Sequence, residues 1–249
     1  MSPSMLVLAC ALLALTAPMA SAARHTLAQT VAARHLLSCN AGCSQIMSSA
    51  TSFAVLAYST VTSQGLTNLT GDLGLYPGSD VVGFPPATYS GTAYISQPPA
   101  VKAQSDATIG YNSLGSMAYN ASDDISGVPL GGLTLTRGKY FFSGAAQLTG
   151  NLTLDAQDDS TSLFVIQTAT TFQTAVGAQI LLVNGAQPCN VFIAVGSSAT
   201  LLADGIFSGT IVAYQSISVS ENVTVQGSLI ALGAAVTMVS NTVVAQGAC

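Results

Sequence analysis

Beyond Thr51, short runs of β-branched and other apolar residues alternate with stretches of Gly, Asn, Asp and Ser. The clearest pattern is a repeated triplet of apolar, polar and apolar residues: Ala-Thr-Leu at 199–201, Ile-Ser-Val at 217–219 and Val-Thr-Met at 236–238. The triplets start 18 and then 19 residues apart. A period this short is typical of one turn of a solenoid built from short strands with tight corners. The sequence therefore predicts a mainly β protein, a three-faced β-solenoid.

The alternation within each triplet decides which side chains face the core, because neighbouring residues of a strand point to opposite sides. Stacked turns lie about 4.8 Å apart and pair their backbones with one another. Gly209 and Gly227 recur at the same place in consecutive repeats, which indicates corners with positive φ or a close backbone approach. The residues expected to point inward are Ile217, Val219, Val236 and Met238.

One segment breaks the strand pattern and is expected to form a helix. Residues 99–122 carry apolar side chains at intervals of three and four, which is the spacing of one helical face. The segment is weakly charged and contains two glycines that lower its helix propensity. We therefore expect the helix to pack along one side of the solenoid. Its apolar stripe consists of Ala103, Ala107, Tyr111, Leu114 and Ala118.

The outward positions of the repeat form columns of small polar residues. An earlier segment adds Thr171 and Gln173 to them if Phe172, which stands between these two residues, points inward. Such ladders are common on any β-solenoid, so by themselves they indicate an exposed sheet and no particular ligand. The first column consists of Thr200, Ser218 and Thr237, and the second of Ser198, Ser216 and Ala235.

The beginning of the chain is typical of an export signal. An apolar run at 5–15 is followed by Ala20-Ser21-Ala22, which matches a cleavage site. The run is too short to span a membrane, and no later stretch reaches about 18 uninterrupted apolar residues. We therefore expect a signal peptide at 1–22, an extension at 23–51 and a solenoid domain at 52–249, in a secreted protein.

If the protein is exported, its cysteines are candidates for disulfides and its sequons are candidates for N-glycosylation, because both modifications occur in secreted proteins. Once Cys10 leaves with the signal, four cysteines remain, an even number that suits two disulfides in any of three pairings. Four N-x-S/T sequons also occur. The candidate disulfide residues are Cys39, Cys43, Cys189 and Cys249, and the candidate glycosylation sites are Asn68, Asn120, Asn151 and Asn222.

Composition excludes several classes of function. Only 6% of the residues are charged and the net charge is -5, which opposes a surface that tracks nucleic-acid phosphates. Both histidines, His25 and His35, precede the solenoid, so a Ser-His-Asp triad, a Cys-His dyad or a multi-histidine zinc site is excluded there. We expect no catalysis, no metal, no cofactor, no nucleic-acid or membrane partner, and a monomer.

Short motifs run through the domain in order between about residues 52 and 246. They are GDLGLYPG at 71–78, VGFPP at 82–86, GLTL at 132–135, GKY at 138–140, LTGNLTLD at 148–155, NGA at 184–186, NVF at 190–192 and VGSSATL at 195–201. Together they resemble the ice-binding (antifreeze) proteins of the DUF3494 type. The resemblance implies a discontinuous right-handed β-solenoid with a long helix alongside. It also implies adsorption to ice that inhibits ice growth or recrystallisation.

An uncharged strand face suits a surface that adsorbs to ice. Strand spacing is regular, short side chains lose little entropy on docking, and charged groups would hold their own hydration water instead. In the family the corresponding strand lies on the ice-binding face, and Thr60 falls at a family position there. The candidate ice-binding residues are thus Thr60, Thr171, Gln173, Ser198, Thr200, Ser216, Ser218, Ala235 and Thr237.

Two rival functions remain open at this point. A polysaccharide-active β-helix enzyme needs clustered acids and bases. The acidic pairs at 123–124 and 158–159 lie among turn residues, however, and Arg137 and Lys139 are the only nearby cations. A structural or adhesive extracellular glycoprotein would use the sequons, the disulfides and a flat sheet that binds a regular polymer surface.

Overall fold

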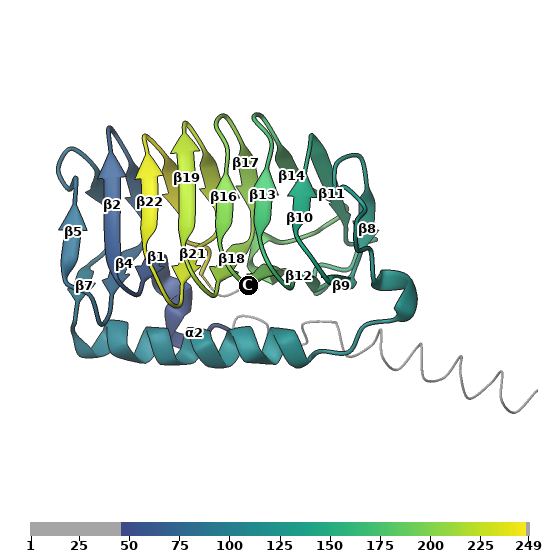
Figure 1. Ribbon diagram of the computed structural model, residues 1–249, viewed down its shortest axis with the longest axis horizontal. Coiled ribbons are helices and arrows are strands. Elements are labelled where there is room, and N and C mark those ends of the chain that lie inside the picture. Colours follow the sequence, from purple (N-terminus) through teal and green to yellow (C-terminus); the bar gives the residue numbers. More distant parts are fainter. Residues whose placement is uncertain (1–45, 248–249) are drawn as a thin grey trace, which may run out of the picture. The chain divides into compact units, whose positions relative to one another are not determined.

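The computed structural model describes residues 46–247, which form a solenoid of three β-sheets with one long helix alongside (Figure 1). All strand pairings of these sheets are parallel. The predicted three-faced β-solenoid with a helix at its side is therefore confirmed.

The three sheets, sheet 1, sheet 2 and sheet 3, contain eight, seven and eight strands in the described part of the chain. Sheet 1 contains β7 (Ala93–Ile95), β4 (Asp72–Leu75), β1 (Phe53–Ala57), β21 (Leu229–Ala231), β18 (Thr210–Ala213), β15 (Val191–Val195), β12 (Phe164–Thr168) and β9 (Gly138–Phe142). Sheet 2 contains β10 (Ala146–Leu148), β13 (Phe172–Thr174), β16 (Ala199–Leu201), β19 (Ile217–Glu221), β22 (Val236–Val239), β2 (Thr60–Gln64) and β5 (Asp80–Val82). Sheet 3 contains β6 (Thr88–Tyr89), β3 (Asn68–Thr70), β23 (Thr242–Val244), β20 (Thr224–Gln226), β17 (Ile206–Ser208), β14 (Gln179–Val183), β11 (Asn151–Asp155) and β8 (Thr134–Thr136).

The solenoid consists of two blocks that are separated in sequence. Strands β1–β7 build the turns at one end, and the helix α2 (Pro98–Ser116) then carries the chain to the other end, where β8 begins the second block. The last turn stacks on the first: β21 pairs with β1, β22 with β2 and β23 with β3. The junction between the blocks therefore lies inside every sheet.

The repeats predicted from the sequence stack in register. Ile217 pairs with Ala199 on one side and with Val236 on the other. Gly209 has a φ of +121°, and a Cβ on Gly227 would overlap the backbone oxygen of Gly209, so both corners need glycine. The side chains expected inside are all buried: Ile217, Val219, Val236 and Met238.

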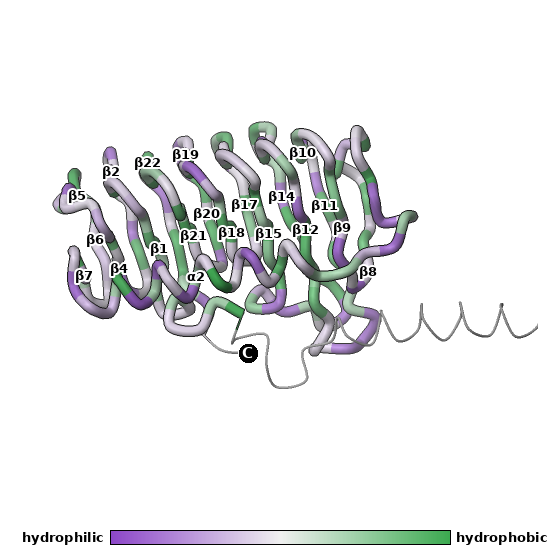
Figure 2. Tube along the Cα trace, turned by 60° about the horizontal axis from the view of Figure 1, so that its bottom comes forward, coloured by the Kyte–Doolittle hydropathy of each residue, from purple (hydrophilic) through white to green (hydrophobic). Residues whose placement is uncertain are grey.

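Sheet 1 is buried on both of its faces. Its inner face contributes to the central core, and its outer face is covered by α2 and by the short 3-10 helix η2 (Ser48–Ser52). Ala103, Ala107 and Leu114 of α2 pack here with Val165 and Ile230 of the sheet. Strands buried on both sides read as continuous apolar runs, as β1 and β15 do. Figure 2 shows the hydrophobic strand segments following one another along the solenoid.

The helix ends earlier than its apolar stripe predicted. It stops at Ser116, so Ala118 lies beyond it and is exposed. The buried ammonium group of Lys139 donates hydrogen bonds to the backbone oxygens of Gly115 and Met117, each at 2.7 Å. A cation favours the carbonyl end of a helix, and this contact from β9 ends the helix where the chain must turn toward the solenoid.

The N-terminal predictions fall largely outside the described residues. The expected signal peptide and most of the expected extension lie there, together with Cys39, Cys43 and Cys249. No helix in the described part of the chain is both long and apolar enough to cross a membrane.

Candidate functional site

The outer face of sheet 2 presents the columns predicted from the repeat. Thr200, Ser218 and Thr237 pair in register on β16, β19 and β22. Gln173 precedes them on β13, where Phe172 is buried and Thr171 exposed, as expected. The helix α2 contacts strands of sheet 1, so it leaves this face uncovered (Figure 1).

The second column runs beside the first, two residues earlier in each strand. Ser198, Ser216 and Ala235 precede the inward residues of β16, β19 and β22, and all three are partly exposed. Thr60 stands one residue before Val61, which pairs with Val236, so Thr60 continues this column on β2. All the residues predicted for the face thus lie on one side of one sheet.

Hydroxyl groups on this face bond to each other along the solenoid axis. The Oγ atoms of Ser198 and Ser216 are 3.0 Å apart, and the Thr237 hydroxyl donates to the Ser218 Oγ over 3.3 Å. These contacts cross from one turn to the next. They restrict the rotation of the hydroxyls, so the face has a more regular pattern of donors and acceptors than freely rotating serines would give.

The structure adds three residues to the first column. Thr62 pairs with Thr237 on one side and with Val82 on the other, and Gln147 pairs with Gln173 at the opposite end. Alternation from Thr60 would have predicted Thr62 outward. Its place next to Thr237 could not be foreseen, because β2 and β22 meet only at the junction of the two blocks.

The two columns on the outer face of sheet 2 are free of charge from β13 to β2, and acidic residues lie at the margins of this region. Asp80 is exposed on the edge strand β5. Glu221 is exposed at the end of β19, where the pairing with β22 shifts register. Next to it, the Asn222 amide donates to Asp204 at the corner toward sheet 3. The uncharged region therefore centres on β16, β19, β22 and β2.

Sheet 3 is a second exposed face with a different composition. One of its outward columns runs from Asn151 through Gln179, Ile206, Thr224 and Thr242 to Asn68. Long amides and large apolar groups interrupt this column, and Leu181 beside it is also exposed. Sheet 2 therefore presents the smaller and more uniform set of side chains.

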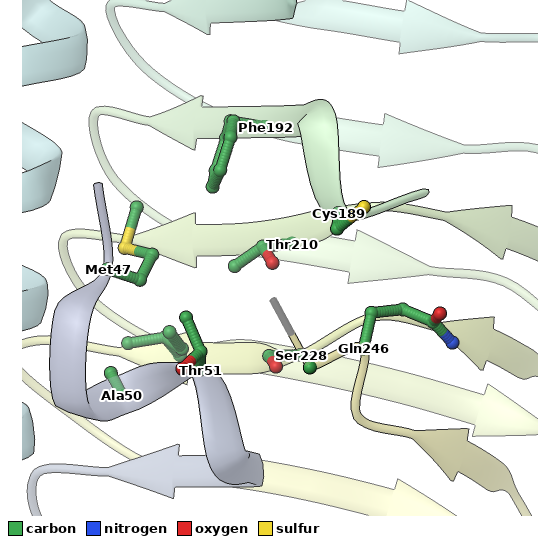
Figure 3. A pocket seen from close by; sticks show the side chains of 10 residues that line it. Met47, Ala50, Thr51, Cys189, Phe192, Thr210, Ser228 and Gln246 are labelled. Atoms are coloured by element: carbon green, nitrogen blue, oxygen red, sulfur yellow. The ribbon is translucent and has the colours of Figure 1, made fainter. Parts of the chain in front are cut away.

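A small hollow lies between η2 and sheet 1 (Figure 3). The described residues that line it include no acid, base or histidine, so they offer no general acid–base pair. Within residues 46–247, no three His, Cys, Asp or Glu side chains come close enough to hold a metal ion. One lining residue, Cys189, is disulfide-bonded, and its partner lies outside the described residues.

The charged groups considered for a polysaccharide-active enzyme are engaged in structural contacts. Lys139 is buried at the end of α2, and Arg137 donates to Asp159 over 2.8 Å. Asp159 also accepts from the Thr161 hydroxyl, which contributes most to holding its pKa below the usual range. Asp123 completes the capping box of the short 3-10 helix η3 (Ala121–Asp123). The pair at 158–159 lies in a turn region, as predicted, whereas Asp123 is the last residue of η3 and Asp124 forms an isolated bridge with Phe141.

Comparison with known proteins agrees with this architecture. The model of the Ice-binding-like family matches residues 55–244. This chain belongs to that family. A family relative, the ice-binding protein of Nostoc sp. (strain HG1), is 45% identical over 199 residues, which is 80% of this chain and 73% of that protein.

Solved structures of the family give the same result. An ice-binding protein from an Antarctic biological consortium has a TM-score of 0.77 and 42% identity, over 80% of this chain and 89% of that one. The ice-binding protein of the Antarctic ascomycete Antarctomyces psychrotrophicus has a TM-score of 0.77 and 36% identity, over 80% and 97%. The motif resemblance found in the sequence is therefore confirmed.

Proposed function

We propose that this protein is secreted and adsorbs to ice through the outer face of sheet 2, so that it inhibits ice growth or recrystallisation. Family membership supports the ligand, and the uncharged double column on β16, β19, β22 and β2 supports the face. The role is adsorption without catalysis, by a monomer whose partner is the crystal surface.

The physical basis is a regular array of small groups on a stiff support. Backbone pairing fixes the strand separation at about 4.8 Å, so equivalent side chains repeat at that interval along the column. Serine, threonine and alanine lose little rotamer entropy on contact with a surface. Each contact is weak, and adsorption depends on many of them acting at once.

The decisive test places bulky side chains on the outer face of sheet 2 and compares this variant with one that carries them on sheet 3. The double variant Ser218→Tyr, Thr237→Tyr places two rings side by side on sheet 2, and tyrosine is a good strand former. The matched control is Thr224→Tyr, Thr242→Tyr, which does the same on β20 and β23 of sheet 3. Both are produced in a bacterial host, checked for folding by circular dichroism, and added to a seeded crystal held just below its melting point.

The sheet 2 variant is expected to abolish faceting and growth arrest, and the control is expected to retain both. A folded sheet 2 variant with undiminished activity would contradict the proposed face. Loss of activity in the control alone would move the ice-binding surface to sheet 3. An inactive parent protein would contradict the proposed function itself.

A further inference from the structure

The four sequons share the same sequence motif, but their asparagines differ in exposure and in side-chain hydrogen bonding. Asn68 and Asn151 are exposed, and each is the first residue of its strand, β3 and β11 respectively. Register places both in the same outward column of sheet 3, five strand steps or about 24 Å apart. Within the described part of the chain, neither side-chain nitrogen donates a hydrogen bond, so both amides are available for modification.

The other two sequons are tied into local structure. The Asn120 side-chain nitrogen donates to Asp123 over 2.8 Å within the capping box of η3, and the residue is partly buried. The Asn222 nitrogen donates to Asp204 over 2.8 Å from a backbone with φ of +60°. A sugar on either nitrogen would have to displace or crowd a carboxylate that the fold uses.

From this difference we infer that Asn68 and Asn151 are the N-glycosylation sites of the folded protein, and that sheet 3 is its glycan-bearing face. In this modification the asparagine amide nitrogen loses a hydrogen and bonds to the first sugar of an oligosaccharide. The bond from that sugar to the pyrophosphate of a lipid carrier breaks, and the lipid pyrophosphate leaves with the proton. The inference rests on the export proposed above.

The placement has a consequence for the two exposed sheets. Both are uncharged over most of their area, and sheet 3 also exposes Leu181 and Ile206. Open sheets with apolar groups are prone to association between molecules. Glycans at Asn68 and Asn151 stand on either side of Ile206 in its column, so they shield this face from other molecules. Sheet 2 carries none of the four sequons and stays open to ice.

The test is site occupancy in a eukaryotic host that secretes glycoproteins. The full chain is placed behind the host's own leader, so that the result does not depend on residues 1–22. Glycans are removed enzymatically in heavy-oxygen water, which turns each occupied asparagine into labelled aspartate, and the peptides are measured by mass spectrometry. We expect Asn68 and Asn151 to be occupied in most molecules, and Asn120 and Asn222 in few.

Single variants supply the controls. Asn68→Gln and Asn151→Gln are each expected to lower the mass of the secreted protein by one glycan, whereas the matched Asn222→Gln leaves it unchanged. An empty Asn68 or Asn151, or an Asn222 as fully occupied as these two, would overturn the inference. Enzymatic removal of the glycans should leave ice-growth inhibition intact. Occupancy is read by mass alone, so its failure is distinct from a failure of the ice-binding proposal.

Discussion

One buried asparagine lies at the junction between the two blocks. Asn241, 1% exposed, stands at the corner between β22 and β23. Its side-chain nitrogen donates to the Ser220 backbone oxygen over 2.6 Å, and its side-chain oxygen accepts from the Val239 backbone nitrogen over 2.7 Å. Its backbone nitrogen donates to the Thr67 hydroxyl at the corner of the other block. One residue thus connects three successive turns of the solenoid.

Replacing this residue should cost a large part of the stability. Asn241→Ala removes both side-chain hydrogen bonds and leaves the carbonyl of Ser220 and the N–H group of Val239, both in partly buried residues, without these partners. Fully buried orphaned groups cost about 1–3 kcal/mol each; because these two are only partly buried, the free energy of unfolding should fall by about 2–4 kcal/mol, the lower part of the summed range. Domains of this size are stable by only about 5–15 kcal/mol, which makes the loss easy to measure.

Urea unfolding followed by circular dichroism provides the assay, with protein from a bacterial host. The matched control is Asn151→Ala, at an exposed strand position, which should change the free energy of unfolding by less than about 0.5 kcal/mol. A loss for Asn241→Ala below about 1 kcal/mol, or one equal to the control, would refute the stabilising role of these two side-chain hydrogen bonds beside the junction.

Three further predictions concern Lys139 at the end of α2, the carboxylate of Asp106 and the backbone at Gly83. Lys139→Met should lower the free energy of unfolding by about 2 kcal/mol in urea titrations, because the carbonyls of Gly115 and Met117 at the end of α2 lose a charged donor while the cost of burying the ammonium is regained. The control is Arg137→Met, which removes the partly exposed ion pair between Arg137 and Asp159 and should cost less than about 1 kcal/mol. Equal losses of stability in the Lys139 and Arg137 variants would contradict this account. The Lys102 ammonium and the Ser49 hydroxyl hold the pKa of Asp106 below its usual range, so this carboxylate stabilises the fold at neutral pH. Its contribution is present above the unfolded pKa of about 4 and is lost as pH falls toward the folded pKa. Thermal unfolding of Asp106→Asn should thus show a shallower acid dependence than the parent, and an unchanged acid limb would count against the contact. Gly83→Ala should fold poorly, because φ at this residue is +87° and a Cβ would overlap the Ser63 backbone oxygen. The control Gly127→Ala is also at positive φ but has open space around it, so it should lower the free energy of unfolding by only about 1 kcal/mol. Proteolysis should therefore degrade the Gly83 variant faster than the Gly127 variant.

Much of the fold could be predicted from local pattern. The triplets at 199–201, 217–219 and 236–238 identified three consecutive turns, because alternation fixes which residues of a short strand are buried. The helix was also visible, since its apolar spacing needs no knowledge of its partner. Its end was not, because the residue that ends it, Lys139, comes from a distant strand.

The sequence by itself determined the parts that depend on neighbours along the chain: the strands, the inward residues and the low charge of the exposed columns. Only the tertiary structure decided how the two blocks join, since the pairing of β22 with β2 links residues far apart in sequence and places Thr62 beside Thr237. It also decided which sheet the helix covers and on which faces the sequons stand. The helix covers sheet 1 because the outer side of this sheet is apolar, and although the apolar runs are visible in the sequence, the segment that packs on them comes from a distant part of the chain.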